Sequence, residues 1–180
     1  EIFIANNVAG TIRSQKITPN NSNGWSNEFK YEFRPDGSFI AVSNAGDEEI
    51  EIFNPSNGAH IKTLTNPASA GDLFADNFAV TQNYLVITAS RADVGANNSG
   101  SVYVYEIPDV LTGTWAPILT LNGENGSDHF GTSCAVSDED VLAIGALGYD
   151  NTTAGGTVVS DSGQVYICLL YTSDAADELC

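Results

Sequence analysis

The residues that could support catalysis are few and scattered along the chain. Residues 131–135 read Gly-Thr-Ser-Cys-Ala and resemble the nucleophile elbow of hydrolases, in which a sharp turn presents a serine. Such an elbow requires a strand, a turn and a helix, together with an acid and a histidine later in the chain. This segment is predicted to be a strand, and no histidine follows it. We therefore expect no nucleophilic role for Ser133.

The remaining candidate side chains do not form a recognisable site. His60 and His129 are the only histidines, and they fall at different positions of the repeat described below. We expect both to be surface or strand-end side chains, and Cys134 to be a small buried residue. The chain has no C-x-x-C pattern and no glycine-rich phosphate loop. The sequence therefore predicts no catalytic, cofactor-binding or metal-binding residues, and we expect the protein not to be an enzyme.

The chain is strongly acidic, with 23 acidic and 6 basic residues and a formal net charge of −17. An acidic surface repels phosphate groups, so we exclude nucleic acid and anionic membranes as partners. No apolar run reaches the roughly 18 residues of a membrane-spanning helix. We therefore expect no membrane insertion.

The C-terminal segment, residues 168–180, differs from the rest of the chain. Residues 168–178 resemble the in-frame translation of an adapter used to prepare sequencing libraries. We therefore treat residues 168–180 as non-native, the alternative being a natural C-terminus, and expect residues 1–167 to be a fragment of a longer protein. Without the three acids of that segment the net charge is about −14. Residues after about Tyr171 are expected not to continue the repeat.

Short strands joined by polar turns are predicted throughout residues 1–167, and no helical periodicity is present. Aromatic residues alternate with polar ones over residues 29–33, which is typical of a strand. Pro35-Asp36-Gly37-Ser38 is a turn sequence, because proline presets φ and glycine accepts positive φ. Further strands are expected at residues 1–4, 11–18, 39–42, 50–53, 60–64, 74–80, 84–89, 102–105, 115–121, 128–136, 141–146 and 162–167.

The strand pattern repeats along the chain. Phe29, Phe33, Ile40 and Val42 map onto Phe74, Phe78, Leu85 and Ile87 at a shift of 45 residues, and Leu85 maps onto Leu142 at a shift of 57. Repeats of about 40–60 residues with four strands each are typical of propeller blades. We predict an all-β, incomplete β-propeller of four-stranded antiparallel blades. Its parts are a partial blade 1–18, blades 29–64 and 74–121, and a truncated blade 128–167.

The last copy resembles the FG-GAP repeat, which is best known from integrin alpha subunits and from bacterial and phage surface proteins. The resemblance is carried by Phe130-Gly131, Ser133-Cys134-Ala135-Val136, Leu142-Ala143-Ile144-Gly145-Ala146 and Ser162-Gly163-Gln164-Val165-Tyr166-Ile167. The family pattern has valine in place of Cys134 and proline in place of Leu147. The copy at 74–121 is looser, with Ala75 and Thr88 at the two glycine positions, and the copy at 29–64 keeps only the spacing and the aromatic residues.

The resemblance implies a non-enzymatic binding or adhesion module of an extracellular or virion-surface protein, with a protein or glycan ligand and the remaining blades as partners. Two alternatives stay open, the propeller domain of a secreted enzyme and a purely structural fibre or scaffold segment, because a fold does not determine a function.

Some family members carry a calcium loop between the first two strands of a blade. Here that connection is residues 81–83 or 137–140, which is too short to supply six or more oxygen ligands. The longer loops hold Asp93, and Asp150 with Asp161. We expect no cofactor and at most weak Ca²⁺ binding by these acidic loops.

Alternation and the matching positions also predict burial. We expect a buried set of apolar residues, an exposed turn at residues 138–140, and packing of Val165 and Ile167 between stacked sheets about 10 Å apart. Gly163, where a loop re-enters the sheet, is predicted to need an unusual φ. The buried set is Phe74, Phe78, Leu85, Ile87, Phe130, Leu142 and Ile144.

Overall fold

The structure is a computed structural model that describes residues 2–8, 11–18, 29–68 and 70–170. Within these residues every regular element is a β-strand, and no helix occurs. The strands are β1 (Ile2–Val8), β2 (Thr11–Ile17), β3 (Tyr31–Phe33), β4 (Ile40–Asn44), β5 (Glu49–Phe53), β6 (His60–Thr65), β7 (Phe74–Val80), β8 (Tyr84–Ala89), β9 (Ser101–Glu106), β10 (Pro117–Asn122), β11 (Phe130–Val136), β12 (Val141–Ala146), β13 (Asn151–Thr152), β14 (Val158–Val159) and β15 (Gln164–Leu169).

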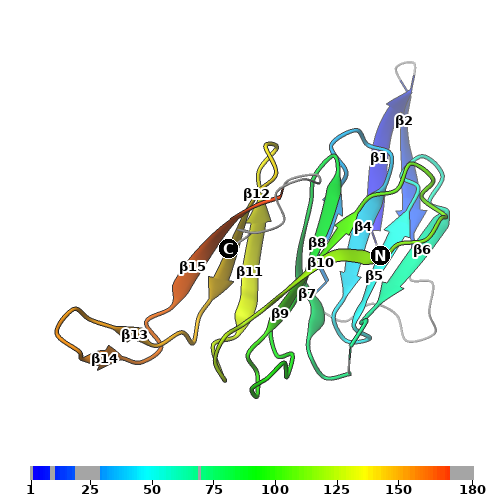
Figure 1. The fold of residues 1–180 in the computed structure, drawn as a ribbon. Helices are drawn as coiled ribbons and strands as arrows, with labels where there is room; N and C mark the ends of the chain where they lie inside the picture. Colours follow the sequence, from blue (N-terminus) through cyan, green and yellow to red (C-terminus); the bar gives the residue numbers. More distant parts are fainter. Residues whose placement is uncertain (1, 9–10, 19–28, 69, 171–180) are drawn as a thin grey trace.

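The strands form antiparallel sheets that stand side by side (Figure 1). We call them blade 1 (β1 and β2), blade 2 (β3 to β6), blade 3 (β7 to β10) and blade 4 (β11, β12 and β15). Blades 2 and 3 are four-stranded meanders, and the small hairpin β13–β14 is inserted between β12 and β15. Blade 4 lies at one end of the row, so the described sheets form an open array (Figure 1). The predicted all-β, incomplete propeller of four-stranded blades is confirmed.

An apolar layer fills the space between each pair of adjacent blades. One layer joins blades 1 and 2, a second joins blades 2 and 3, and a third joins blades 3 and 4. Strands in the middle of the array are therefore covered on both faces, and β4 and β8 are buried along their whole length. In β12 of blade 4, in contrast, deeply and partly buried residues alternate, because only one face is covered by blade 3.

The predicted buried set is confirmed, since each of its seven members is at most 5% exposed. The expectation for Val165 and Ile167 was wrong, because these side chains are 65% and 61% exposed. Both lie on the face of β15 that points away from blade 3, as their pairing with Gly145 and Ala143 shows. No described segment covers that face.

The expected exposed turn at residues 138–140 is only partly correct. Asp138 and Glu139 are exposed, but Asp140 is half-buried. Its carboxylate accepts hydrogen bonds from Thr81 Oγ1 at 3.3 Å and Asn83 Nδ2 at 3.4 Å. These residues belong to the matching turn of blade 3, so two equivalent turns of adjacent blades meet here.

The first strands of blades 2, 3 and 4 are joined by side chains that cross between blades. Lys30 Nζ donates to the Asp76 carbonyl at 2.7 Å, and Asn77 Nδ2 donates to the Thr132 carbonyl at 2.6 Å. Glu32 is half-buried, and its carboxylate accepts the Val80 N–H at 2.9 Å. Burial raises the pKa of Glu32, and the hydrogen bond from Val80 offsets this only in part.

We predict that Glu32→Gln stabilises the protein at neutral pH. The raised pKa means that the folded chain binds the Glu32 proton more tightly than the unfolded chain does. The free energy of unfolding therefore falls as the pH rises from the ordinary glutamate pKa through the raised one, because Glu32 becomes ionised in the folded chain. Glutamine keeps an acceptor for Val80 and removes the charge. Urea titrations at pH 7 and pH 3.5 should show a higher free energy of unfolding for the variant at pH 7 and little difference at pH 3.5. Equal differences at both pH values would contradict the prediction.

Candidate functional site

Three connections of blades 3 and 4 gather at one end of the array (Figure 1). They are the β8–β9 loop (90–100), the β10–β11 connection (123–129) and the β12–β15 segment (147–163), which carries the β13–β14 hairpin. We call this end the loop face. Backbone hydrogen bonds tie the three segments together, from Ser127 N to the Asn97 carbonyl at 2.8 Å and from Gly148 N to the Asp128 carbonyl at 3.0 Å. The loops are therefore held by one another as well as by their own strands.

Two glycines allow the backbones of blades 3 and 4 to approach closely. A Cβ on Gly100 would lie 2.1 Å from the Phe130 carbonyl oxygen, and a Cβ on Gly123 would lie 2.1 Å from the Ser99 carbonyl oxygen. Gly100 also has a φ of +89°, which side chains disfavour. The contact includes a hydrogen bond from Phe130 N to the Ser99 carbonyl at 2.9 Å. Glycine is thus required where the chain passes into blade 4.

The loop face contains a polar hollow of about 590 Å³ between residues 125–128 and 148–161. Asp128 lines it and is buried, and its Oδ2 accepts hydrogen bonds from Asn125 N and Nδ2, each at 3.1 Å. At the rim, Asp150 Oδ1 accepts the Asp161 N–H at 2.8 Å. These carboxylates order the loops around the hollow, and the exposed rim presents polar groups to solvent.

The elbow-like sequence lies within the continuous strand β11 and not on a turn before a helix. Ser133 is exposed, and Cys134 packs partly against the layer between blades 3 and 4. Burial raises the pKa of the Cys134 thiol to about 12, and the nearby Glu32 carboxylate acts in the same direction. The thiolate, which is the nucleophilic form, is therefore scarce at neutral pH.

The two histidines lie in different blades and bind neighbours within the scaffold. In blade 2, His60 Nε2 is 2.9 Å from Thr63 Oγ1, and its ring packs edge-on against Phe53. His129 precedes β11, and its Nδ1 is 3.2 Å from the Ser90 carbonyl. The structure thus assigns both rings local packing contacts.

The repeat spacing and the blade geometry agree with a comparison against known families. The sequence matches the family model of the FG-GAP repeat over residues 62–105 and 117–168, which is more than half of the chain. The chain belongs to the FG-GAP repeat family. The matched regions include most of blade 3 and reach Cys168 near the end of β15 in blade 4. No curated protein matches the sequence.

The FG-GAP blades bring the predicted acidic residues to one end but do not gather them. Asp93 belongs to the β8–β9 loop, where its Oδ1 accepts the Asn98 N–H at 2.7 Å. Asp150 and Asp161 belong to a different segment, the one that connects β12 and β15. Among residues 2–8, 11–18, 29–68 and 70–170, no three His, Cys, Asp or Glu side chains are grouped so that they could hold a metal ion. Within the same ranges there is no helix long and apolar enough to cross a membrane.

Sequence reasoning missed the role of Gly100 and Gly123 in joining the blades. A signal was present, because Ser99-Gly100 in blade 3 and Ser162-Gly163 in blade 4 occupy matching positions of the repeat. The predicted unusual backbone at Gly163 is confirmed by its φ of +71°. The sequence pattern did not indicate that a second stretch of backbone approaches Gly100 closely.

We predict that Ca²⁺ binds no more tightly than a dissociation constant of about 10⁻⁴ M, the range of weak extracellular sites. Asp93 and Asp150 already accept backbone hydrogen bonds in separate loops, so few carboxylate oxygens can converge on one ion. Calorimetric titration with CaCl₂ measures this directly. A sub-micromolar dissociation constant would show that the loops rearrange into a complete site.

Proposed function

We propose that this chain is part of a non-enzymatic binding or adhesion module of an extracellular or virion-surface protein, and that its loop face contacts a protein or glycan ligand. The observation that carries the proposal is the hydrogen bonding of three long loops from two blades into one rigid surface. Binding residues are often placed on loops that a rigid scaffold positions. FG-GAP repeats are frequent in adhesion and surface proteins, which supports the same interpretation.

The chemistry of the hollow supports a polar ligand. Its lining includes the amide, hydroxyl and carboxylate groups of Asn125, Ser127, Thr152, Ser160 and Asp161. These groups can donate hydrogen bonds to, and accept them from, sugar hydroxyls or peptide groups. The acidic surface favours neutral or cationic partners over nucleic acid.

The proposal is tested by presenting the full chain to an array of defined glycans and to a panel of purified extracellular-matrix proteins. The double variant Asp150→Ala and Asp161→Ala alters the rim of the hollow. The double variant Asp138→Ala and Glu139→Ala removes the same number of charges from the exposed turn between β11 and β12, at the opposite end of blade 4. We expect at least one glycan or protein to bind the chain. Its affinity should fall at least tenfold in the Asp150/Asp161 variant and stay unchanged in the Asp138/Glu139 variant.

Three results would contradict the proposal. They are the absence of any bound glycan or protein, an equal loss of affinity in both variants, and chemical breakdown of the bound glycan by the purified chain. The last result would favour the propeller of a secreted enzyme instead.

A further inference from the structure

Asparagine followed by glycine is a chemically reactive pair, and the chain contains four such pairs. They are residues 23–24, 57–58, 122–123 and 125–126, of which the first lies outside the described residues. The glycine backbone nitrogen can attack the amide carbon of the asparagine side chain, because glycine carries no Cβ that would hinder the approach. A hydrogen bond from that nitrogen opposes the attack, since it must break before the nitrogen can turn towards the side chain. The hydrogen bonds of the glycines therefore rank the three described pairs.

The pair 57–58 lies in the turn between β5 and β6 and is held at both reacting groups. Gly58 N donates to the Asn54 carbonyl at 2.8 Å. The Asn57 side chain is also engaged, because its Oδ1 accepts the Ala59 N–H at 3.0 Å. Attack within this pair would have to break both hydrogen bonds.

The pair 122–123 at the end of β10 is held in the same way. Gly123 N donates to the Gly100 carbonyl at 2.9 Å. Asn122 Oδ1 accepts a hydrogen bond from the Ser101 hydroxyl, also at 2.9 Å. We therefore expect both of these pairs to be protected in the folded chain.

The pair 125–126 differs, because Gly126 N–H donates to none of the residues that the structure describes. The N–H groups on either side do form bonds, from Asn125 to Asp128 Oδ2 at 3.1 Å and from Ser127 to the Asn97 carbonyl at 2.8 Å. Asn125 Nδ2 also donates to Asp128 Oδ2, at 3.1 Å. Asn125 and Gly126 are exposed and line the polar hollow of the loop face, so water reaches both reacting groups.

We propose that Asn125 is a site of spontaneous deamidation in the folded chain, and that losing its amide loosens the loop face. The Gly126 nitrogen gives its proton to water, and its electron pair forms a bond to Cγ of Asn125. The Cγ–Nδ2 bond breaks, and Nδ2 takes up a proton and leaves as ammonia. Water then opens the resulting five-membered succinimide at either carbonyl, which yields aspartate or isoaspartate. One water is consumed for each ammonia released.

The loosening follows from the contacts of the Asn125 amide. After deamidation a carboxylate stands where Nδ2 donated to Asp128, so two like charges meet beside a side chain that is only 4% exposed. Isoaspartate also adds a methylene to the backbone two residues before Ser127, which ties this segment to Asn97. The reaction needs only water, so the inference does not rest on the proposed ligand.

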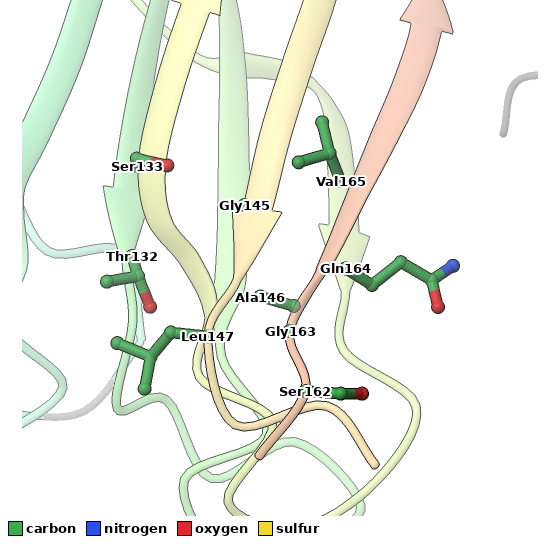
Figure 2. A pocket seen from close by; sticks show the side chains of 9 residues that line it. All are labelled: Thr132, Ser133, Gly145, Ala146, Leu147, Ser162, Gly163, Gln164 and Val165. Carbon is green, nitrogen blue, oxygen red and sulfur yellow. The ribbon is translucent and has the colours of Figure 1, made fainter. Parts of the chain in front are cut away.

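The second hollow of blade 4 supplies an internal control. It measures about 370 Å³ and lies where β11, β12 and β15 meet. Figure 2 shows Gln164 there, with its side-chain amide extending away from the other labelled residues. Gln164 is exposed like Asn125, but its attack would close a six-membered ring and would come from the nitrogen of the branched Val165. This amide should persist, so exposure alone does not explain conversion at Asn125.

The test is to incubate the full chain at pH 7.4 and 37 °C in H₂¹⁸O and to map its peptides by mass spectrometry. Opening of the succinimide inserts an ¹⁸O atom, which distinguishes this reaction from deamidation during digestion. We expect Asn125 to convert at least tenfold faster than Asn57 and Asn122, with no conversion at Gln164. In urea, where the hydrogen bonds are lost, the three asparagines should convert at rates within threefold of one another.

The consequence is tested by amide hydrogen exchange in two variants with the same change of charge. Asn125→Asp reproduces one product of the reaction and should speed exchange of the Ser127 amide at least tenfold, because its contact with Asp128 becomes repulsive. Asn57→Asp adds the same charge to blade 2 and should leave the Ser127 amide unchanged.

Similar rates at the three asparagines of the folded chain would overturn the inference. So would an intact Asn125 in the folded chain after a time in which the chain in urea loses half of its Asn125 amide. Unchanged exchange of the Ser127 amide in Asn125→Asp would overturn the loosening of the loop face.

Discussion

Replacing Gly100 with alanine is expected to lower the free energy of unfolding by about 2–5 kcal/mol, the combined scale of a left-handed backbone and an overpacked contact. The new Cβ would lie 2.1 Å from the Phe130 carbonyl oxygen and 2.6 Å from its backbone nitrogen. Neither atom can move without displacing the first residue of β11. The substitution should therefore separate blade 4 from blade 3, which chemical denaturation can detect as a lost or earlier transition.

Gly95→Ala is the matched control. Gly95 lies in the same β8–β9 loop and has a φ of +78°, but a Cβ there would meet nothing within 4 Å. Its loss of stability should therefore reflect the backbone alone, about 1–2 kcal/mol. Equal losses for the two variants would show that the close approach of Gly100 to Phe130 does not hold the blades together.

Phe130→Ala is expected to destabilise the protein by about 3–5 kcal/mol, as large-to-small changes in a packed core do. Phe130 is 4% exposed, and its ring packs edge-on against Tyr166 with centroids 5.1 Å apart. It also belongs to the layer that holds Val102 of blade 3 and Leu142 of blade 4. Removing the ring leaves a cavity in that layer and weakens the packing of the two blades.

Phe33→Ala serves as the comparison for this variant, because the same residue type is 45% exposed at that position in β3. Thermal and urea unfolding should show a loss for Phe33→Ala that is well below half of the loss for Phe130→Ala. Similar losses for the two variants would contradict the packing described between blades 3 and 4.

The strands and the core could be predicted because each is encoded locally and more than once. Phe78, Ile87 and their neighbours occupy matching positions in different copies, and the alternation within a strand determines which face they share. The continuous burial of β8 goes beyond this alternation, because it arises only when neighbouring blades cover both of its faces.

The contacts between blades could not be predicted from the same pattern. Asp140 was expected in solvent, and its partners Thr81 and Asn83 lie 59 and 57 residues earlier in the chain. The exposure of the Val165 and Ile167 side chains has a related cause. They would be buried only if another segment packed against their face of β15, and no described residue does so. The alternation within a strand indicates which apolar side chains share a face, whereas the residues that cover that face depend on how the blades are arranged.

The same distinction applies to the candidate site. The sequence offered no reason to expect a nucleophile elbow at Ser133, because the required turn, helix and downstream histidine are missing from its pattern. The polar hollow of the loop face could not be predicted, since it arises where residues 125–128 meet a segment about 20 residues further along the chain.

The central claim is that blades 3 and 4 form one interlocked unit, and native-state amide hydrogen exchange tests it most directly. The amides of Ser127, His129 and Phe130 donate to the carbonyls of Asn97, Asn98 and Ser99 at the connection between the blades. We predict that these three amides exchange as slowly as those of the buried strands β8 and β9, because one cooperative opening exposes them all. Rapid exchange of the three while β8 and β9 remain protected would show that blade 4 is not fixed to blade 3, and would contradict the claim.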